Sequence, residues 1–214
     1  MMRSANIEAQ IANKISLLRR WVTARLGGIA HEKRVASLAA ALVRATAPLH
    51  TLSTQEMRTL RWGALVHDVG RSVSDKNHPL IGARMILRDR SLPLKNRQRR
   101  ALAFLARHHR GTVPIIHEDR ILRPHDDAPA LRLVLAFLRA ADGLDSRSLP
   151  SPRVKFRLQG RVLKINCWLA SDSPKARRVF SRRKKFRLLE EMLGCKVQVA
   201  IRSTSLTRRL RLAA

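Results

Sequence analysis

The sequence is poor in acidic and aromatic residues, and it contains no tyrosine. Its 214 residues include 15 aspartates and glutamates against 44 lysines and arginines, which gives a formal net charge of +29. Such an excess of one sign makes a surface repel itself unless counter-ions or an anionic partner lie on it. We therefore expect a polyanionic partner, while the shortage of aromatic side chains argues against recognition by base stacking.

The sequence also lacks cysteine pairs, secretory signals and membrane spans. Cys167 and Cys195 have no metal-ligand spacing and offer no disulfide framework, so we expect buried thiols in a reducing compartment. Charged residues between Glu8 and Arg20 interrupt the N-terminal apolar stretch. No segment approaches the roughly 20 apolar residues that a membrane helix needs. These absences predict a cytoplasmic protein with no membrane contact.

What is present is helical periodicity, which dominates the first two thirds of the chain. The 45% of hydrophobic residues can support a real core. Ser53 and Glu56 have the spacing of a capping box at a helix start. The apolar spacing predicts a bundle of about six helices, at 5–26, 31–47, 54–68, 78–90, 96–109 and 128–147.

A second pattern begins after the proline-containing segment 148–152. Residues 154–158 and 162–165 alternate with period 2 around Gln159-Gly160, which predicts a β-hairpin. Residues 173–193 then predict one long basic helix, and 196–201 a further strand. The fold class is therefore mainly α, with a helical domain at 1–148 followed by a small basic α/β (ββαβ) module at 149–214. That module holds 18 basic and 3 acidic residues.

Four residues on three of the predicted helices carry metal-binding chemistry. His31 opens the second helix, His67 and Asp68 close the third, and Asp142 lies in the last helix of the bundle. Imidazole and carboxylate together suit Mn²⁺, Fe, Ni²⁺, Zn²⁺ or Mg²⁺. An incomplete protein shell leaves positions for water and a phosphate oxygen, and a metal there makes hydroxide from water near neutral pH. We expect His67 and Asp68 to be central to catalysis.

The pattern H…HD…D at these residues resembles the HD superfamily of metal-dependent phosphohydrolases. The stretches HEKRVASLAAAL, APLHTLS, ALVHDVGRSVS, LARHHRG and LRAADGLDSR further resemble the C-terminal region of the exopolyphosphatase/guanosine pentaphosphate phosphatase family, from residue 28 onward. The resemblance implies an HD-type helical bundle and a homodimer. The actin-like catalytic region of that family is missing from this sequence, so its exopolyphosphatase activity does not carry over.

A second metal ion is implied by the resemblance to two-metal HD proteins. His78-Pro79 with Gly82 resembles their HPxxG motif, and His108-His109 resembles their paired histidines, although their GYP signature is absent. Adjacent helix residues point about 100° apart, so we favour His109 over His108 as a ligand. His78 has the alternative role of a helix cap. With two ions, Asp68 would bridge them.

Basic residues flank these candidate ligands and fill the last module. The candidate phosphate-binding residues are Arg71, Lys76, Arg107, Arg110 and Arg147. The candidate polyanion-binding residues are Arg177, Arg178, Arg182, Arg183, Lys184 and Lys185, for which the alternative is a solvated helix face. We expect Asp145 to pair with Arg147 or to cap a turn.

The leading interpretation is a metal-dependent phosphohydrolase that acts on a nucleotide or another phosphate ester, with one or two divalent ions as cofactor. The alternative is a non-catalytic regulatory protein that binds polyphosphate, a guanosine alarmone or nucleic acid. The expected partners are a phosphate-containing small molecule or polyphosphate, nucleic acid, and a second copy of the chain.

Overall fold

The structure is a computed structural model that describes residues 2–113 and 119–203. It is mainly helical, with a three-stranded sheet, as the sequence predicts. The helices are α1 (Met2–Leu26), α2 (Ala30–Ala45), α3 (Thr54–Val66), α4 (His78–Arg88), α5 (Asn96–His108), α6 (Ala128–Asp142), α7 (Pro174–Phe180) and α8 (Arg187–Leu193). The strands are β1 (Arg153–Gln159), β2 (Val162–Leu169) and β3 (Lys196–Ser203). Short 3₁₀ turns include η1 (Ala47–Leu49), η2 (Val69–Ser72) and η4 (Arg183–Lys185).

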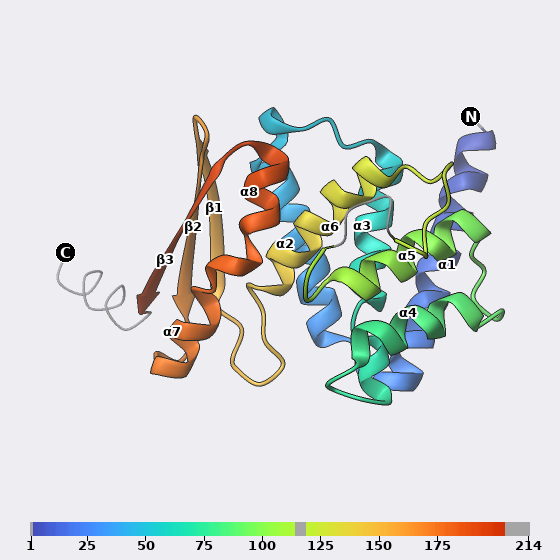
Figure 1. The fold of residues 1–214 in the computed structure, drawn as a ribbon, viewed down its shortest axis with the longest axis horizontal. Coiled ribbons are helices and arrows are strands. Elements are labelled where there is room, and N and C mark those ends of the chain that lie inside the picture. The colour runs from blue at the N-terminus through green and yellow to red at the C-terminus, as the bar shows by residue number, and fades with distance from the viewer. Residues whose placement is uncertain (1, 114–118, 204–214) are drawn as a thin grey trace.

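Helix α6 forms the centre of the bundle because it is apolar on nearly every side. A helix of that kind is stable only when it is surrounded. Val134, Leu135, Phe137 and Leu138 have no exposed surface, and α6 contacts α2, α3, α5 and α8 (Figure 1). The C-terminal end of α6, which carries Asp142, is therefore held among neighbouring elements.

Local signals set the bounds of α3 and the approach of α4. The Ser53–Glu56 capping box begins α3 as predicted, and His67 is its C-cap. A Cβ on Gly70 would lie 2.2 Å from the carbonyl oxygen of His78 and 2.5 Å from the nitrogen of Gly82. Only glycine fits such an approach, so the segment after His67 packs directly against the first turn of α4.

The sheet lies at the end of the molecule opposite α1 (Figure 1). Strands β1 and β2 form the predicted antiparallel hairpin, with Gly160 in its turn at φ +55°. Strand β3 pairs with β2 in parallel, so α7, η4 and α8 form the crossover between them.

The single long basic helix predicted for 173–193 is wrong. Helix α7 ends at Phe180, a 3₁₀ turn follows, and α8 begins at Arg187. Phe180 packs with Leu169 and Ala176, whereas Phe186 packs into the main core. In one continuous helix these two side chains would point about 120° apart. Burying both of them against their different partners requires the helix to break.

One hydrophobic core runs through the bundle and the sheet. Leu163 and Ile165 of β2 and Leu189 of α8 belong to the same buried cluster as Leu138 of α6. The division into domains at 1–148 and 149–214 stays a prediction, and the end of the second module, 204–214, lies outside the described residues. Among the described residues, no helix combines the length and the apolar character needed to cross a membrane.

Candidate metal centre

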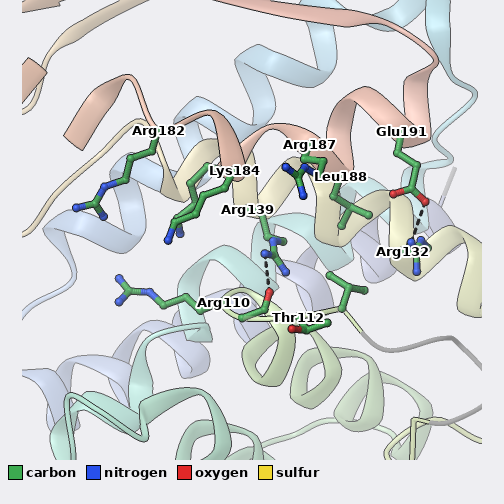
Figure 2. Close-up of a pocket in the computed structure, with 12 residues that line it drawn as sticks. Arg110, Thr112, Arg132, Arg139, Arg182, Lys184, Arg187, Leu188 and Glu191 are labelled. Carbon is green, nitrogen blue, oxygen red and sulfur yellow. Dashed lines mark hydrogen bonds and ion pairs between the residues drawn. The ribbon is translucent and has the colours of Figure 1, made fainter. Parts of the chain in front are cut away.

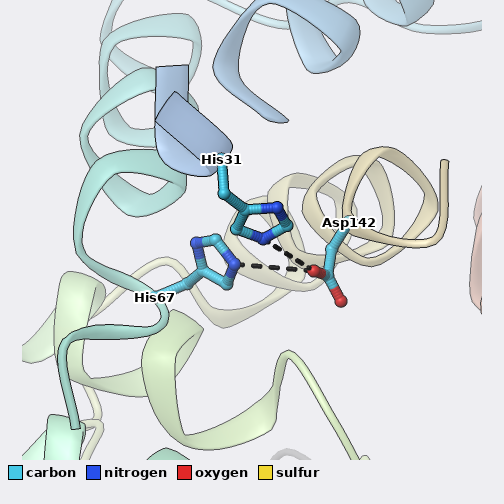
Figure 3. Close-up of side chains that lie close together, drawn as sticks. All are labelled: His31, His67 and Asp142. Atoms are coloured by element: carbon cyan, nitrogen blue, oxygen red, sulfur yellow. Dashed lines mark ion pairs between the residues drawn. The ribbon is translucent and has the colours of Figure 1, made fainter. Parts of the chain in front are cut away.

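His31, His67 and Asp142 come from three different helices and meet at one point (Figure 3). The Nε2 atom of His31 lies 3.4 Å from Oδ1 of Asp142, and Nε2 of His67 lies 3.6 Å from the same oxygen. All three side chains are buried. Their ligand atoms lie within 4.8 Å of one another, close enough to hold one ion.

Asp68 joins this group to two further histidines. Its Oδ1 atom lies 3.2 Å from Nε2 of His78 and 3.3 Å from Nε2 of His109. The two Nε2 atoms are 3.2 Å apart. His67, Asp68 and His109 form a second set whose ligand atoms fit round one ion. We call these six residues, His31, His67, Asp68, His78, His109 and Asp142, the histidine–aspartate cluster.

The outward-facing Nδ1 atoms of all four histidines are fixed by acceptors. Nδ1 of His67 donates to the carbonyl of Ala64 at 2.9 Å, and Nδ1 of His109 donates to the carbonyl of Ala106 at 2.7 Å. The corresponding acceptors are the carbonyl of Asp75 for His78, at 2.6 Å, and Oδ2 of Asp145 for His31, at 2.9 Å. Carbonyl and carboxylate oxygens can only accept, so each Nδ1 carries the proton.

The consequence is that, whenever its imidazole is neutral, each inward-facing Nε2 atom presents a lone pair. Nε2 of His31, Nε2 of His67 and Oδ1 of Asp68 are buried and have no hydrogen-bond partner among the described residues. Acceptors gathered in this way repel one another unless a proton or a cation lies between them. Histidines that bind a metal through one nitrogen while an acceptor holds the other have this arrangement.

The cluster holds its carboxylates ionised. Burial alone would raise the pKa of Asp68, but His67 and the contacts from His109 and His78 bring that pKa well below its usual range. Burial likewise opposes ionisation of Asp142, and Lys185 and the two nearby histidines outweigh it and lower its pKa. The carboxylates are therefore ready to bind a cation at neutral pH.

The pKa values of two histidines in the cluster are shifted in opposite directions. Burial opposes protonation of His31, but Asp142 and Asp145 raise its pKa to about 9. Burial lowers the pKa of His109 to about 4, so its imidazole is neutral at neutral pH. A proton thus resides at the His31 side of the cluster, where a cation would have to displace it.

Three cationic side chains touch the outer oxygens of the carboxylates. Arg71 and Arg147 both donate from Nε to Oδ2 of Asp68, at 2.8 and 3.0 Å. Lys185 donates to Oδ2 of Asp142 at 2.6 Å. Beside them lies a cavity of about 320 Å³, the cluster cavity, which His31, Asp68 and Asp142 line together with Arg71, Arg110, Arg147, Arg182 and Lys185. A phosphate group entering this cavity would meet cations on several sides.

The remaining candidates lie elsewhere. His108 turns away from the cluster and lies 2.6 Å from Asp119, as expected for adjacent helix residues that point in different directions. Lys76 is exposed in the loop before α4, and Arg107 is half-buried on α5. Neither Lys76 nor Arg107 lines the cluster cavity.

The candidate polyanion-binding residues also separate into groups. Arg177 pairs with Asp172, and Arg183 pairs with Glu190. Lys185 reaches Asp142, and only Arg178, Arg182 and Lys184 lack an acidic partner among the described residues. The prediction of one basic helix at 173–193 placed all these charges round a single helix. Because the chain breaks between α7 and α8, they do not surround one helix.

Sequence reasoning missed the roles of Asp145, Glu32 and Lys185. Asp145 accepts from His31, and from Ser151 at 2.7 Å, rather than pairing with Arg147. This is possible because α6 ends at Asp142, short of the predicted 147. Arg147 instead contacts Asp68 and the buried Glu32. Of these three residues, only Glu32 had a sign of its role in the sequence, because it is an acidic residue directly after His31.

Comparison with known proteins gives a family for the part of the chain that carries the cluster. A family model described as Ppx/GppA phosphatase, domain III, matches residues 28–148, which is more than half of the chain. The search of curated proteins found no match. All six residues of the histidine–aspartate cluster fall inside the matched part, and Lys185 falls outside it. The chain belongs to the family of domain III of the Ppx/GppA phosphatases.

Proposed function

We propose that the protein is a metal-dependent phosphohydrolase of the HD type, with the histidine–aspartate cluster as its centre. The observation that supports this most is the orientation of the four histidines. Each is fixed at Nδ1 by an acceptor and directs Nε2 toward Asp68 or Asp142. Buried polar atoms normally have a hydrogen-bond or ionic partner. A cation between the inward-facing nitrogens and the carboxylates would be such a partner for all of them at once.

The donor set fits one or two divalent ions. His31, His67 and Asp142 would hold one ion, with Asp68 beside them, and His78, His109 and Asp68 would hold another. Nitrogen and carboxylate ligands suit Mn²⁺, Fe, Ni²⁺, Zn²⁺ and, less well, Mg²⁺. A bound divalent ion supplies Lewis-acid activation of water and of a phosphoryl oxygen.

The residues of the chain would orient both the ligands and the substrate. Arg71 and Arg147 hold Oδ2 of Asp68, which leaves Oδ1 directed toward His78 and His109. Both arginines and Arg110 line the cluster cavity, so they are the side chains we assign to the phosphate oxygens of a nucleotide or another phosphate ester.

A second candidate function is non-catalytic binding of a polyanion, with the cluster in a structural role. It is supported by Arg71, Arg147 and Lys185, which already neutralise part of the negative charge of Asp68 and Asp142. In that case polyphosphate, an alarmone or nucleic acid would bind and not be cleaved.

Metal analysis followed by an activity screen separates the two functions. The protein is loaded with each of Mn²⁺, Fe²⁺, Ni²⁺, Zn²⁺ and Mg²⁺, and phosphate release is measured from nucleoside mono- and polyphosphates, cyclic dinucleotides and a generic phosphodiester. We expect Asp68→Asn to lose metal and turnover while it keeps its circular dichroism spectrum. The matched control is Asp172→Asn, which changes an exposed carboxylate that also pairs with an arginine. Absence of turnover with every metal, together with tight polyanion binding, would support the second function instead.

A further inference from the structure

A second cavity, of about 630 Å³, lies next to the cluster cavity. Arg110 lies on one side of it; on the other, Arg182 and Lys184 project from the segment between α7 and α8, and Arg187 projects from the first turn of α8 (Figure 2). Arg139 of α6 lies between the two sides. We call it the basic cavity. Arg110, Arg182 and Lys185 line both cavities. The two spaces are therefore adjacent, and a single molecule could reach from one to the other.

The basic cavity has far more positive charge than its own acids can balance. Among the described residues, Glu191 is the one acid in its lining, and Arg132 already pairs with it at 2.8 Å. Arg110, Arg182, Lys184 and Arg187 have no acidic partner among the described residues. Four unpaired cations round one cavity attract an anion with several negative charges.

The backbone beneath these cations is fixed by specific contacts. Arg139 donates to the carbonyls of His108 and Gly111, at 3.0 and 2.8 Å, which secures the segment directly after α5 that carries Arg110. Arg183 binds Glu190 at 2.7 Å and also the carbonyl of Val197, which secures the turn that carries Lys184. Donors on a fixed backbone lose little freedom when an anion binds.

Lys185 stands where the two cavities join. Its side chain passes over Gly143, where a Cβ would lie 2.7 Å from the Cβ of Lys185. The missing side chain at Gly143 therefore lets the ammonium of Lys185 reach Asp142 at the edge of the cluster. An ammonium in this position can also contact a phosphate that spans the two spaces.

We propose that the basic cavity binds the further phosphate groups of a substrate whose reacting phosphate lies at the histidine–aspartate cluster, an inference that rests on the proposed function. The substrate class is a small molecule with two or more phosphate groups, either condensed with one another or carried on a small scaffold. The described residues that line the basic cavity include no aromatic side chain on which a base could stack. Arg182, Lys184, Lys185 and Arg187 lie beyond the part of the chain that matches the family model.

Calorimetric titration of the whole chain, with a metal chelator present, tests this site. The probes are orthophosphate, pyrophosphate, tripolyphosphate, adenosine 3′,5′-bisphosphate and an oligothymidylate. They are titrated into the wild-type protein and into the double variant Lys184→Gln, Arg187→Gln, whose positions line the basic cavity and not the cluster cavity. The matched control is Arg84→Gln, Arg88→Gln, which removes the same charge from exposed positions on α4. A circular dichroism melt checks folding, and Arg187→Gln alone replaces the double variant if that variant does not fold.

We expect the wild-type and control proteins to bind pyrophosphate or the bisphosphate about ten-fold or more tightly than orthophosphate. The cavity variant should lose most of that increase and retain its orthophosphate affinity within about three-fold. Preference for pyrophosphate over the bisphosphate would identify a condensed substrate, and the reverse preference a scaffolded one.

Equal losses in the two double variants would overturn the proposal, because net charge alone would then explain the binding. It would also be overturned by an oligothymidylate that binds through the same two residues more tightly than tripolyphosphate. The proposed function and the proposed anion site can fail independently of each other. If no phosphate ester is hydrolysed but the cavity variant loses the expected affinity, the anion site stands without catalysis.

Discussion

His31 is the residue at which proton and metal compete most directly. Its Nδ1 donates to Asp145, and its Nε2 faces Asp142. The two ring nitrogens therefore have different surroundings, and only Nε2 is directed at the cluster. Because Asp145 orients the imidazole from a position outside the cluster, it has the role of the partners that commonly support metal-binding histidines.

Metal affinity should rise with pH in the range set by His31. Burial opposes its protonation, but Asp142 and Asp145 raise the pKa to about 9. Below that pH the imidazole is protonated, and binding of the ion must release the proton. The apparent Kd should therefore fall by up to about ten-fold per pH unit between pH 7 and 9, and level off above pH 9. The measurement is competition with a metal indicator at fixed ionic strength.

A Kd that does not change over this range would contradict the assignment of His31 as a ligand. The His31→Gln variant is the control, since it should weaken binding and also remove most of the slope. In the absence of metal, the free energy of unfolding should instead decrease as the pH rises. The raised pKa of His31 contributes stability below the unfolded value of 6.5, and that contribution is lost as pH rises through about 9.

At the scale of elements, the position of α4 depends on two glycines. Gly70 in η2 and Gly82 in α4 let the two segments approach closely enough for His78 to reach Asp68. His78 and Gly82 are four residues apart and so share one face of the helix. The HPxxG spacing thus has a packing reason as well as a chemical one.

We expect Gly70→Ala to destabilise the fold by about 2 kcal/mol or more, because the new methyl group would overlap the carbonyl of His78. Chemical denaturation measures this change, and metal binding should weaken at the same time as His78 moves away from Asp68. Gly28→Ala is the matched control, since nothing lies within 4 Å of its Cβ position. Equal stability of the two variants would mean that η2 and α4 can separate without cost.

At the scale of the whole molecule, the helical bundle and the sheet share a continuous core. Phe186 and Leu189 belong to the same buried cluster as Leu138 and Ala141. Arg34 of α2 also donates to the carbonyl of Pro152 just before β1. Side chains from before and after the predicted boundary at 148 therefore pack against one another instead of facing solvent.

Thermal unfolding should accordingly occur in one transition for both parts. The shared core couples loss of the sheet to loss of the bundle, because separating them exposes apolar surface on both. Differential scanning calorimetry should give equal calorimetric and van't Hoff enthalpies. Two resolved transitions, with the first removing only strand signal, would show that 149–203 unfolds independently. Truncation after residue 148 should lower the melting temperature if the coupling is real.

The sequence by itself determined the features that depend on neighbouring residues. Apolar periodicity predicted the six helices of the bundle, most of them to within a few residues, but wrongly joined α7, η4 and α8 into one helix. Alternation around Gly160 predicted the hairpin. His31 at a helix start, His67 at a helix end and Asp142 within the last predicted helix already indicated a shared site. These features could be predicted because caps, turns and periodicity act over a few residues.

Only the tertiary structure decided which atoms meet. His31 and Asp145 are separated by 114 positions, and Lys185 and Asp142 by 43. The break that brings Lys185 to Asp142 arises because Phe180 and Phe186 pack against different partners. A sequence with 44 basic residues gives no local sign of which lysine contacts which carboxylate. That choice follows from the packing of α6 against α8, which no single segment encodes.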